Sequence, residues 1–193
     1  MSGPRVGLLF GSFNPVHVGH LILAEHFATR TDLAEVWLVV TPHNPFKAVA
    51  DLLPDTERLR LVELALAGNP HLRAEAIEFG LPRPSYTIAT LDALRQRHPH
   101  HDFVLLMGSD NVPGLPRWQE SARLLSEVDI YVYPRPGYDL PSLEEFPRVK
   151  LMNAPLLDIS ATYIRESLCA GRSIRYLVPA AVEEVLQPPR ASV

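Results

Sequence analysis

Short apolar runs alternate along this chain with segments whose apolar residues recur every three or four positions. The runs have the length of buried strands, and the run from Phe103 to Met107 is the most regular of them. The segments between them have the spacing of amphipathic helices. This alternation is typical of βαβ units, so the sequence predicts an α/β fold: a Rossmann-like, open, mainly parallel sheet with helices on both faces. We expect a single domain over residues 1–193.

The same pattern assigns the individual elements. The expected strands cover residues 6–10, 36–40, 73–79, 103–107, 130–133 and 148–152. The first expected helix follows the first strand, others begin near Asp55, Ser85 and Ser160, and the last starts at Pro179. Asp55, Ser85 and Ser160 are the predicted N-caps, because their side-chain oxygens can accept hydrogen bonds from the free N–H groups of a first turn. Residues 41–54 form a long loop after the second strand.

Composition and charge narrow the classes of function. The 193 residues carry a formal net charge of -4, which argues against broad nucleic-acid binding, since that usually needs a basic face. No apolar run approaches the length of a membrane span, so we expect no membrane partner. Cys169 is the one cysteine and cannot form an internal disulfide, and the N-terminus has no signal-peptide pattern. We therefore expect a protein of the reducing cytoplasm.

The stretch from Gly11 to His20, Gly-Ser-Phe-Asn-Pro-Val-His-Val-Gly-His, joins the first expected strand to the first helix. Gly11 can take backbone angles closed to other residues, and Gly19 leaves room for a close approach. His17 and His20 are three residues apart, so both lie on one face of the first helical turn. Free N–H groups and the positive end of the helix dipole attract anions there, phosphate above all. The residues alone leave three interpretations open: a phosphate site, a metal site formed by the two histidines, or a plain turn.

A second candidate anion site lies near the other end of the sequence. Ser160, Thr162 and Arg165 offer hydroxyl groups, backbone N–H groups and a guanidinium at the start of one helix. Arg165 can reach back over that start, because helical side chains lean toward the N-terminus. Ile159 and Ile164 have the spacing of a hydrophobic staple. The alternative is a capped surface helix whose arginine is solvated.

Three further segments contain residues that could contact a ligand. Gly108 and Asp110 follow the most regular strand, at the edge where open parallel sheets bind ligands, so Asp110 either caps a helix or accepts hydrogen bonds from a sugar. Trp118 is either a core residue or a platform that stacks on a flat ring. Tyr86 and Thr87 either offer free backbone N–H groups to a ligand or only begin a helix.

The pattern G-x-F-x-P-x-H-x-G-H, from Gly11 to His20, resembles the first signature of the nucleotidyltransferase superfamily. The run from Ile159 to Arg165 resembles its second signature, I-S-x-T-x-I-R, although the more common form has serine where Ala161 stands. Within the superfamily, nearly the whole chain resembles the bacterial nicotinate-nucleotide adenylyltransferases. The residues that carry this resemblance are Pro84 to Thr87, Gly108, Asp110, Trp118 and Arg135 to Gly137, with a looser similarity at Asn44 to Lys47.

The resemblance implies an enzyme that transfers the adenylyl group of ATP to nicotinate mononucleotide, giving deamido-NAD and pyrophosphate in NAD biosynthesis. It implies catalytic roles for His17, His20 and Arg165. It implies that ATP contacts Gly11, Ser12, Phe13, His17, Gly19, His20, Gly108, Asp110, Ile159, Ser160, Thr162 and Arg165. It implies that nicotinate mononucleotide contacts Asn14, Lys47, Tyr86, Thr87 and Trp118. Mg²⁺ would arrive on the ATP phosphates, with no metal site built from protein ligands. No role follows for Arg135, and a homo-oligomer is compatible with the sequence.

Other functions remain open from the sequence. The nearest alternative is another member of the superfamily, such as phosphopantetheine adenylyltransferase or a cytidylyltransferase, although residues 84–87 and Trp118 suit a flat acidic ring. A second alternative is a non-catalytic nucleotide-binding module, although binding alone would not require both signature histidines together with the signature arginine. A third is a metal-binding protein that uses His98, His100 and His101, a cluster that equally fits a solvated loop.

Overall fold

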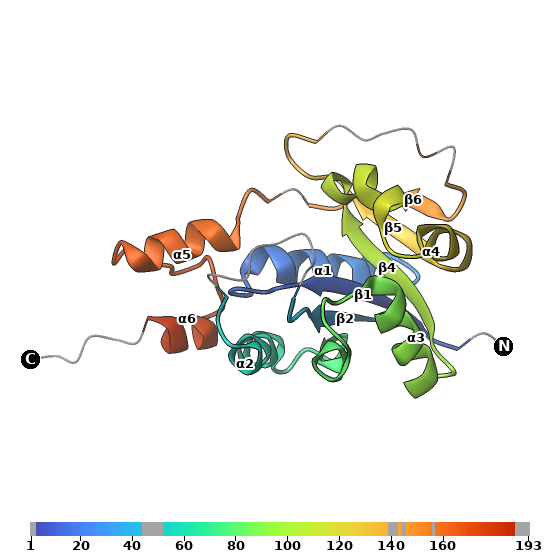
Figure 1. Ribbon diagram of the computed structural model, residues 1–193. Coiled ribbons are helices and arrows are strands. Elements are labelled where there is room, and N and C mark those ends of the chain that lie inside the picture. Colours follow the sequence, from blue (N-terminus) through green and yellow to red (C-terminus); the bar gives the residue numbers. More distant parts are fainter. Residues whose placement is uncertain (1–2, 44–51, 139–142, 144–145, 156, 188–193) are drawn as a thin grey trace, which may run out of the picture.

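The computed structural model describes residues 3–43, 52–138, 143, 146–155 and 157–187 (Figure 1). Its centre is a sheet of six parallel strands in the order β3-β2-β1-β4-β5-β6. The strands are β1 Arg5–Gly11, β2 Glu35–Val40, β3 Leu72–Glu75, β4 Asp102–Gly108, β5 Asp129–Tyr133 and β6 Val149–Leu151. The predicted Rossmann-like α/β fold with a parallel sheet is therefore confirmed.

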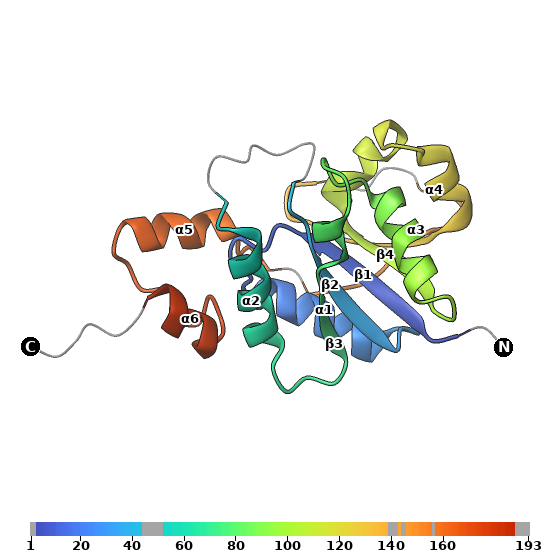
Figure 2. The same ribbon diagram turned by 60° about the horizontal axis from the view of Figure 1, so that its bottom comes forward.

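Helices cover both faces of this sheet, as Figures 1 and 2 show. They are α1 Val18–Arg30, α2 Asp55–Leu66, α3 Thr87–Arg97, α4 Ser121–Glu127, α5 Ala161–Cys169 and α6 Ala180–Leu186, with the 3-10 helices η1 Ile77–Gly80 and η2 Ser109–Arg117. Side chains of α1, α2, α5 and α6 pack with the sheet in one core cluster, and those of α3, α4 and η2 pack in another. None of the described helices is long and apolar enough to cross a membrane.

Burial on both faces explains why the strands stand out in the sequence as unbroken apolar runs. In β4, Val104 and Leu106 belong to the first core cluster, whereas Phe103, Leu105 and Met107 belong to the second. Successive side chains of a strand point to opposite faces, so a strand that is covered on both sides must be apolar throughout. This is the pattern from which the strands were predictable.

The strand order places a topological switch at the centre of the sheet. β1 pairs with β2 on one side and with β4 on the other, and the chain reaches β4 only after it has added β3 at the far side of β2. In open parallel sheets, ligands bind beyond the carboxyl ends of the strands at such a switch. Gly11 ends β1 and Gly108 ends β4, so the loops that follow them lie at this edge.

The predicted strand over residues 73–79 is wrong in its second half. β3 ends at Glu75, and η1 begins two residues later at Ile77. The Glu75 side chain accepts a hydrogen bond from the backbone N–H of Ile77 over 2.9 Å. This local bond takes the place of a strand pairing and turns the chain into η1.

Two of the three predicted N-caps are wrong by one residue. The caps of α2 and α3 are Pro54 and Tyr86, in place of Asp55 and Ser85. Asp55 stands inside the first turn of α2, where two arginine side chains pair with its carboxylate at 2.6 Å each. Its oxygens are therefore used in ion pairs and do not cap the helix.

Candidate active site

The loop between β1 and α1 carries the first signature, and its left-handed residue is not a glycine. The left-handed residue of this loop is Phe13, with φ 45°, and Gly11 has no positive φ. Such an angle is uncommon outside glycine and persists where surrounding contacts hold the residue. Gly11 therefore does not use the backbone freedom that a glycine has. Gly11 is needed for space instead, because a Cβ there would lie 2.8 Å from the Phe13 ring.

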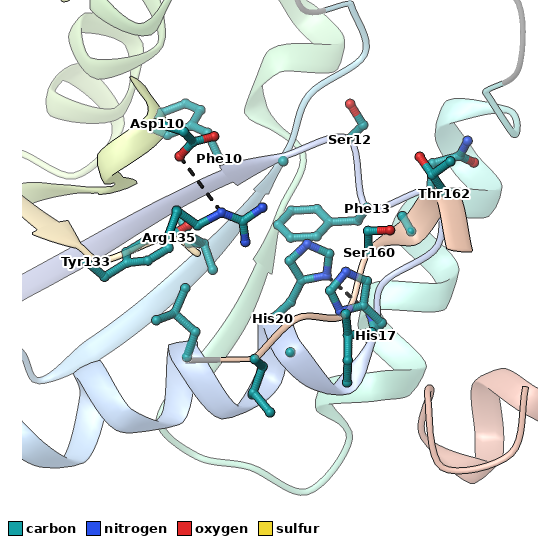
Figure 3. A pocket seen from close by; sticks show the side chains of 18 of the residues that line it. Phe10, Ser12, Phe13, His17, His20, Asp110, Tyr133, Arg135, Ser160 and Thr162 are labelled. Carbon is teal, nitrogen blue, oxygen red and sulfur yellow. Dashed lines mark hydrogen bonds and ion pairs between the residues drawn. The ribbon is translucent and has the colours of Figure 1, made fainter. Parts of the chain in front are cut away.

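His17 and His20 stand where α1 begins, as predicted (Figure 3). The backbone N–H of His17, the N-cap residue, donates to Nδ1 of His20 over 3.3 Å. The two rings stack with centroids 3.7 Å apart, and the Phe13 ring meets His20 in a T-shaped contact at 5.0 Å. Gly19 allows the close approach of the imidazole, since a Cβ there would lie 3.0 Å from His17 Nδ1. The two histidines therefore form one fixed pair.

The His17 ring is neutral at pH 7. The residue is 5% exposed, and within the described part of the chain its Nδ1 has no hydrogen-bond partner. Burial, and after it the positive charge of Arg135, lower the pKa of His17 to about 4. A buried polar atom without a partner is unfavourable, and a polar ligand in front of this ring would supply one.

The second signature forms the start of α5, as predicted. Ser160 is the N-cap, and its Oγ accepts a hydrogen bond from the N–H of Tyr163 over 3.2 Å. Arg165 turns back over this start: Nη1 donates to the backbone oxygen of Asn14 over 2.9 Å, and Nη2 donates to Thr162 Oγ1 over 3.3 Å. The bond to Asn14 joins residues 151 positions apart in the sequence. The two predicted anion sites therefore meet in one place.

A buried arginine that sequence reasoning missed supports the loop of the first signature. Arg58, on α2, is 0% exposed. Its guanidinium donates to the backbone oxygens of Ser12, Thr41 and Leu53. Its charge is compensated by Asp55 at 2.6 Å. Arg58 thus ties the loop after β1 to the end of β2 and to the entrance of α2.

Two adjoining cavities lie at the carboxyl edge of the sheet. The first has a volume of about 450 Å³, and the predicted residues in its lining are Gly11, Ser12, Phe13, Asn14, His17, Gly19, His20, Asp110, Ile159, Ser160, Thr162 and Arg165. The second has a volume of about 290 Å³, and its lining adds the predicted residues Tyr86, Thr87, Gly108 and Trp118. Both are lined by Phe10, Gly11, Ser12, Asp110, Asn111 and Tyr133, so the cavities share a wall.

The structure places two further predicted site residues, and a third lies outside the described part of the chain. Asn14, predicted to contact the mononucleotide, lines the first cavity and is bonded to Arg165. Gly108, predicted to contact ATP, lines the second cavity. Lys47 lies outside the described residues.

Arg135 lines the first cavity, although the sequence suggested no role for it. Its Nε lies 3.9 Å from Asp110 Oδ1 (Figure 3). Its backbone N–H donates to the Ser109 hydroxyl over 2.9 Å. Arg135 follows the carboxyl end of β5 closely. The rule that ligands bind beyond the carboxyl ends of parallel strands, which pointed to Asp110, could therefore have found Arg135 as well. It brings a second guanidinium to the cavity, beside that of Arg165.

The second cavity is built around the start of α3 and the neighbouring η1. Thr87 is the first residue of α3, so free backbone N–H groups are available there. Glu78, from η1, is buried in the same lining, and Thr90 Oγ1 donates to its Oε1 over 2.7 Å. Burial raises the pKa of the Glu78 carboxyl, and the hydroxyls of Thr90, Ser85 and Thr41 oppose that rise. No pattern in the sequence pointed to Glu78, because a single glutamate in an expected strand is ordinarily solvated.

Within the described ranges, no group of three or more histidine, cysteine or carboxylate side chains could hold a metal ion. His98 and His101 instead pack around Trp37, with ring centroids 4.9 and 5.6 Å from it. The alternative of a metal-binding histidine cluster at residues 98–101 therefore finds no support.

Comparison with known proteins identifies the family of this chain. Residues 8–167 match the family described as Cytidylyltransferase-like. A protein of Bacteroides fragilis named "Probable nicotinate-nucleotide adenylyltransferase" is 48% identical over 188 residues, which cover 97% of this chain and 94% of that protein. A protein of Cytophaga hutchinsonii with the same name is 49% identical over 182 residues, which cover 94% of this chain and 95% of that protein.

A solved structure has the same fold. It is described as "Plasmodium falciparum nicotinic acid mononucleotide adenylyltransferase complexed with NaAD" and matches with a TM-score of 0.78, at 19% identity and with 95% of each chain covered. At 19% identity this match shows the fold alone, whereas the similarity to the bacterial relatives shows the family. The chain belongs to the Cytidylyltransferase-like family and, within it, to the nicotinate-nucleotide adenylyltransferases.

Proposed function

We propose that this chain transfers the adenylyl group of ATP to nicotinate mononucleotide, giving deamido-NAD and pyrophosphate in NAD biosynthesis. One observation carries the proposal: the guanidinium of Arg165 donates to the backbone of Asn14, in the loop that presents His17 and His20. The two signatures therefore line one cavity, and a second cavity shares its wall. Transfer between two nucleotides needs two adjoining sites, because much of the barrier is overcome by positioning.

The first cavity suits the triphosphate of ATP. Ser160, Thr162 and Arg165 combine hydroxyl groups, the N–H groups of a helix start and a guanidinium, a set that favours phosphate oxygens. We assign the β- and γ-phosphates to these three residues. We assign the reacting α-phosphate to His20, with His17 beside it, and the ribose to Gly108 and Asp110.

The proposed reaction is a direct displacement at the α-phosphorus. A phosphate oxygen of nicotinate mononucleotide bonds to the α-phosphorus of ATP, the bond from that phosphorus to the bridging oxygen breaks, and pyrophosphate leaves with the electron pair. The nucleophile is already an anion at neutral pH, because the second pKa of a phosphate monoester is about 6. No general base and no covalent intermediate on the protein are required.

The protein's task is to offset repulsion between two polyanions and the charge that grows on the leaving oxygens. Arg135 and Arg165 bring two positive charges to the first cavity. His17, neutral at pH 7, can act as a hydrogen-bond donor without adding charge. Donors that are already fixed around the developing charge lower the barrier, because they need no reorganisation during the reaction.

Mg²⁺ would enter on the phosphates of ATP. Asp110 is the carboxylate in the described lining of the first cavity, and Arg135 lies 3.9 Å from it. The rest of the described polar lining consists of hydroxyl, amide, imidazole and guanidinium side chains, a set that fits phosphate oxygens better than a metal held by the protein. Magnesium often relies on substrate phosphates with few protein ligands, and the ion would neutralise part of the charge on pyrophosphate.

The second cavity suits a pyridine ring that carries a carboxylate. Trp118 offers a flat ring on which the pyridine can stack. The backbone N–H groups at Tyr86 and Thr87, where α3 begins, favour an anion. We therefore assign the nicotinate carboxylate to this helix start and expect the acid form of the mononucleotide to be preferred over the amide form.

A panel of phosphate acceptors tests the proposal. Purified protein is incubated with ATP, Mg²⁺ and, in turn, nicotinate mononucleotide, nicotinamide mononucleotide or phosphopantetheine, and pyrophosphate release is measured. We expect release with nicotinate mononucleotide and a higher kcat/KM for the acid than for the amide. Release with phosphopantetheine alone would reveal another superfamily activity, and ATP binding without release for any acceptor would favour a non-catalytic module. A preference for the amide would refute the assignment within the superfamily.

The partners in this proposal are ATP and nicotinate mononucleotide. The absence of nucleic-acid and membrane partners, the formation of a homo-oligomer and the cytoplasmic location stay predictions from the sequence.

A further inference from the structure

Glu78 is a buried carboxyl group in the second cavity for which the reaction described above has no use. Its side chain comes from η1, is 1% exposed and lines the cavity. Oε1 accepts a hydrogen bond from Thr90 Oγ1 over 2.7 Å, whereas Oε2 has no hydrogen-bond partner among the described residues. A buried carboxylate oxygen without a partner costs free energy, and a bound ligand can remove that cost.

Glu75, three residues earlier, is a useful comparison because it is buried for structural reasons. It is 4% exposed, its Oε1 accepts the N–H of Ile77 over 2.9 Å, and its Oε2 pairs with Arg73 over 3.2 Å. Both oxygens of Glu75 are therefore satisfied. Glu78 has no such cation: burial raises its pKa, and only hydroxyl groups oppose the rise. The charge that would balance Glu78 is missing from the described residues around it.

The rest of the lining suits a flat cation. Four aromatic side chains belong to it, namely Phe10, Tyr86, Trp118 and Tyr133. Aromatic faces attract cations through the negative face of the ring. The other carboxylate of the lining, Asp110, already lies 3.9 Å from Arg135. Arg117 also lines the cavity, but it is an exposed residue and forms no ion pair with Glu78.

We propose that Glu78 is a specificity-determining residue that recognises the positive charge of the substrate's ring. The inference rests on the proposed function, in which the ring nitrogen of a pyridine mononucleotide is bonded to ribose and is therefore cationic. The Glu78 carboxylate attracts this cation and repels a bare anion. The acid group is then accepted only on a ring that carries the compensating charge. The start of α3 recognises the acid group, and Glu78 recognises the ring.

Binding measurements with two forms of one ligand test this role. The probes are nicotinate mononucleotide, with a cationic ring, and its 1,4-dihydro form, which keeps the phosphate and the acid group on an uncharged ring. Each is titrated by calorimetry at pH 8 into the wild-type protein, Glu78→Gln and the matched control Glu75→Gln. We expect the wild-type protein and Glu75→Gln to bind the cationic form about 10-fold more tightly than the dihydro form. In Glu78→Gln this preference should fall below about twofold.

Each other outcome overturns the role of Glu78. If Glu78→Gln binds both ligand forms more weakly by the same factor, Glu78 has a purely structural role. If the variant keeps the preference for the cationic form, other residues recognise the charge of the ring. Far-UV circular dichroism checks the fold, and Glu78→Asp, which retains the charge, should retain the preference. The wild-type protein provides a test without any variant, because equal affinity for the two ring forms also overturns the proposal. These titrations do not depend on turnover. A lack of pyrophosphate release would therefore refute the proposed function, whereas the role of Glu78 is decided by the binding preference.

Discussion

Lowering the pH should destabilise the protein through His17. The pKa of this side chain falls from its ordinary value of 6.5 to about 4 on folding, because burial and Arg135 disfavour the charged ring. Between these two values the folded protein binds fewer protons than the unfolded chain. The contribution of the neutral ring is therefore complete above pH 6.5 and is lost as the pH falls toward 4. At ~1.4 kcal/mol per pH unit, the loss is about 2 kcal/mol by pH 5 and about 3 kcal/mol below pH 4.

A matched variant separates His17 from the other titrating groups. His17→Asn keeps a polar side chain but does not titrate in this range. Urea unfolding followed by tryptophan fluorescence should show the wild-type protein losing about 2 kcal/mol more than the variant between pH 7.5 and 5. The comparison is necessary because Glu78 has a raised pKa, so its contribution is lost as the pH rises through that pKa. Unfolding free energies that change in parallel in the two proteins would refute the buried, neutral state of His17.

The same linkage connects the stability of the fold with the binding of ATP. A phosphate oxygen beside His17 favours the protonated ring, so binding of ATP should raise its pKa and take up a proton near pH 6. Calorimetric titration of ATP in two buffers with different ionisation enthalpies measures this uptake. His17→Asn corrects for protonation of the ATP phosphates themselves. Equal uptake by the two proteins would show that His17 does not contact the triphosphate.

Three other substitutions test the roles assigned to single side chains. His20→Ala should lower kcat by ~10²–10³ while far-UV circular dichroism shows an intact fold, as expected for the loss of one fixed donor, and near-normal turnover would remove His20 from the mechanism. Arg165→Ala should raise the Kd of ATP more than the Kd of nicotinate mononucleotide, each titrated separately, and equal losses would count against a role in phosphate binding. Arg58→Met should lower the unfolding free energy in urea by about 3–5 kcal/mol, because it leaves three backbone oxygens without this donor and leaves Asp55 with Arg83 alone; a loss below about 1 kcal/mol would contradict that role.

Local features were predictable from the sequence, whereas contacts between distant segments were not. The strands follow from apolar runs that are covered on both faces, and the confirmed N-cap Ser160 depends only on the turn that follows it. Asp55 fails as a cap because its carboxylate is held by Arg58, in the next turn, and by Arg83, from a different loop. Residue type predicts that an aspartate can cap, but only the folded chain decides which donors reach it first.

Several side chains around the two cavities illustrate the same limit. Arg58 has the appearance of a solvated residue in the first turns of a helix, yet it is buried because backbone oxygens from separate segments converge on it. Phe13, and not the neighbouring glycine, takes the left-handed backbone angle, and its ring packs against His20. Glu78 lies within a run expected to be a strand, so nothing local marked it as part of a cavity. Arg135 could have been found from its place just beyond a strand end.

The meeting of the two cavities follows from the order of the strands. β1 lies between β2 and β4, and its carboxyl end, from Phe10 to Ser12, lines both cavities. Asp110, Asn111 and Tyr133 complete the shared lining, so two nucleotides bound in the two cavities would meet between these residues and the end of β1. A bulky side chain at Gly11 or Ser12 would keep the attacking phosphate away from the α-phosphorus even if each substrate still bound. In the proposed reaction, catalysis by positioning would therefore depend on the lack of bulk at these two residues as much as on the cations around them.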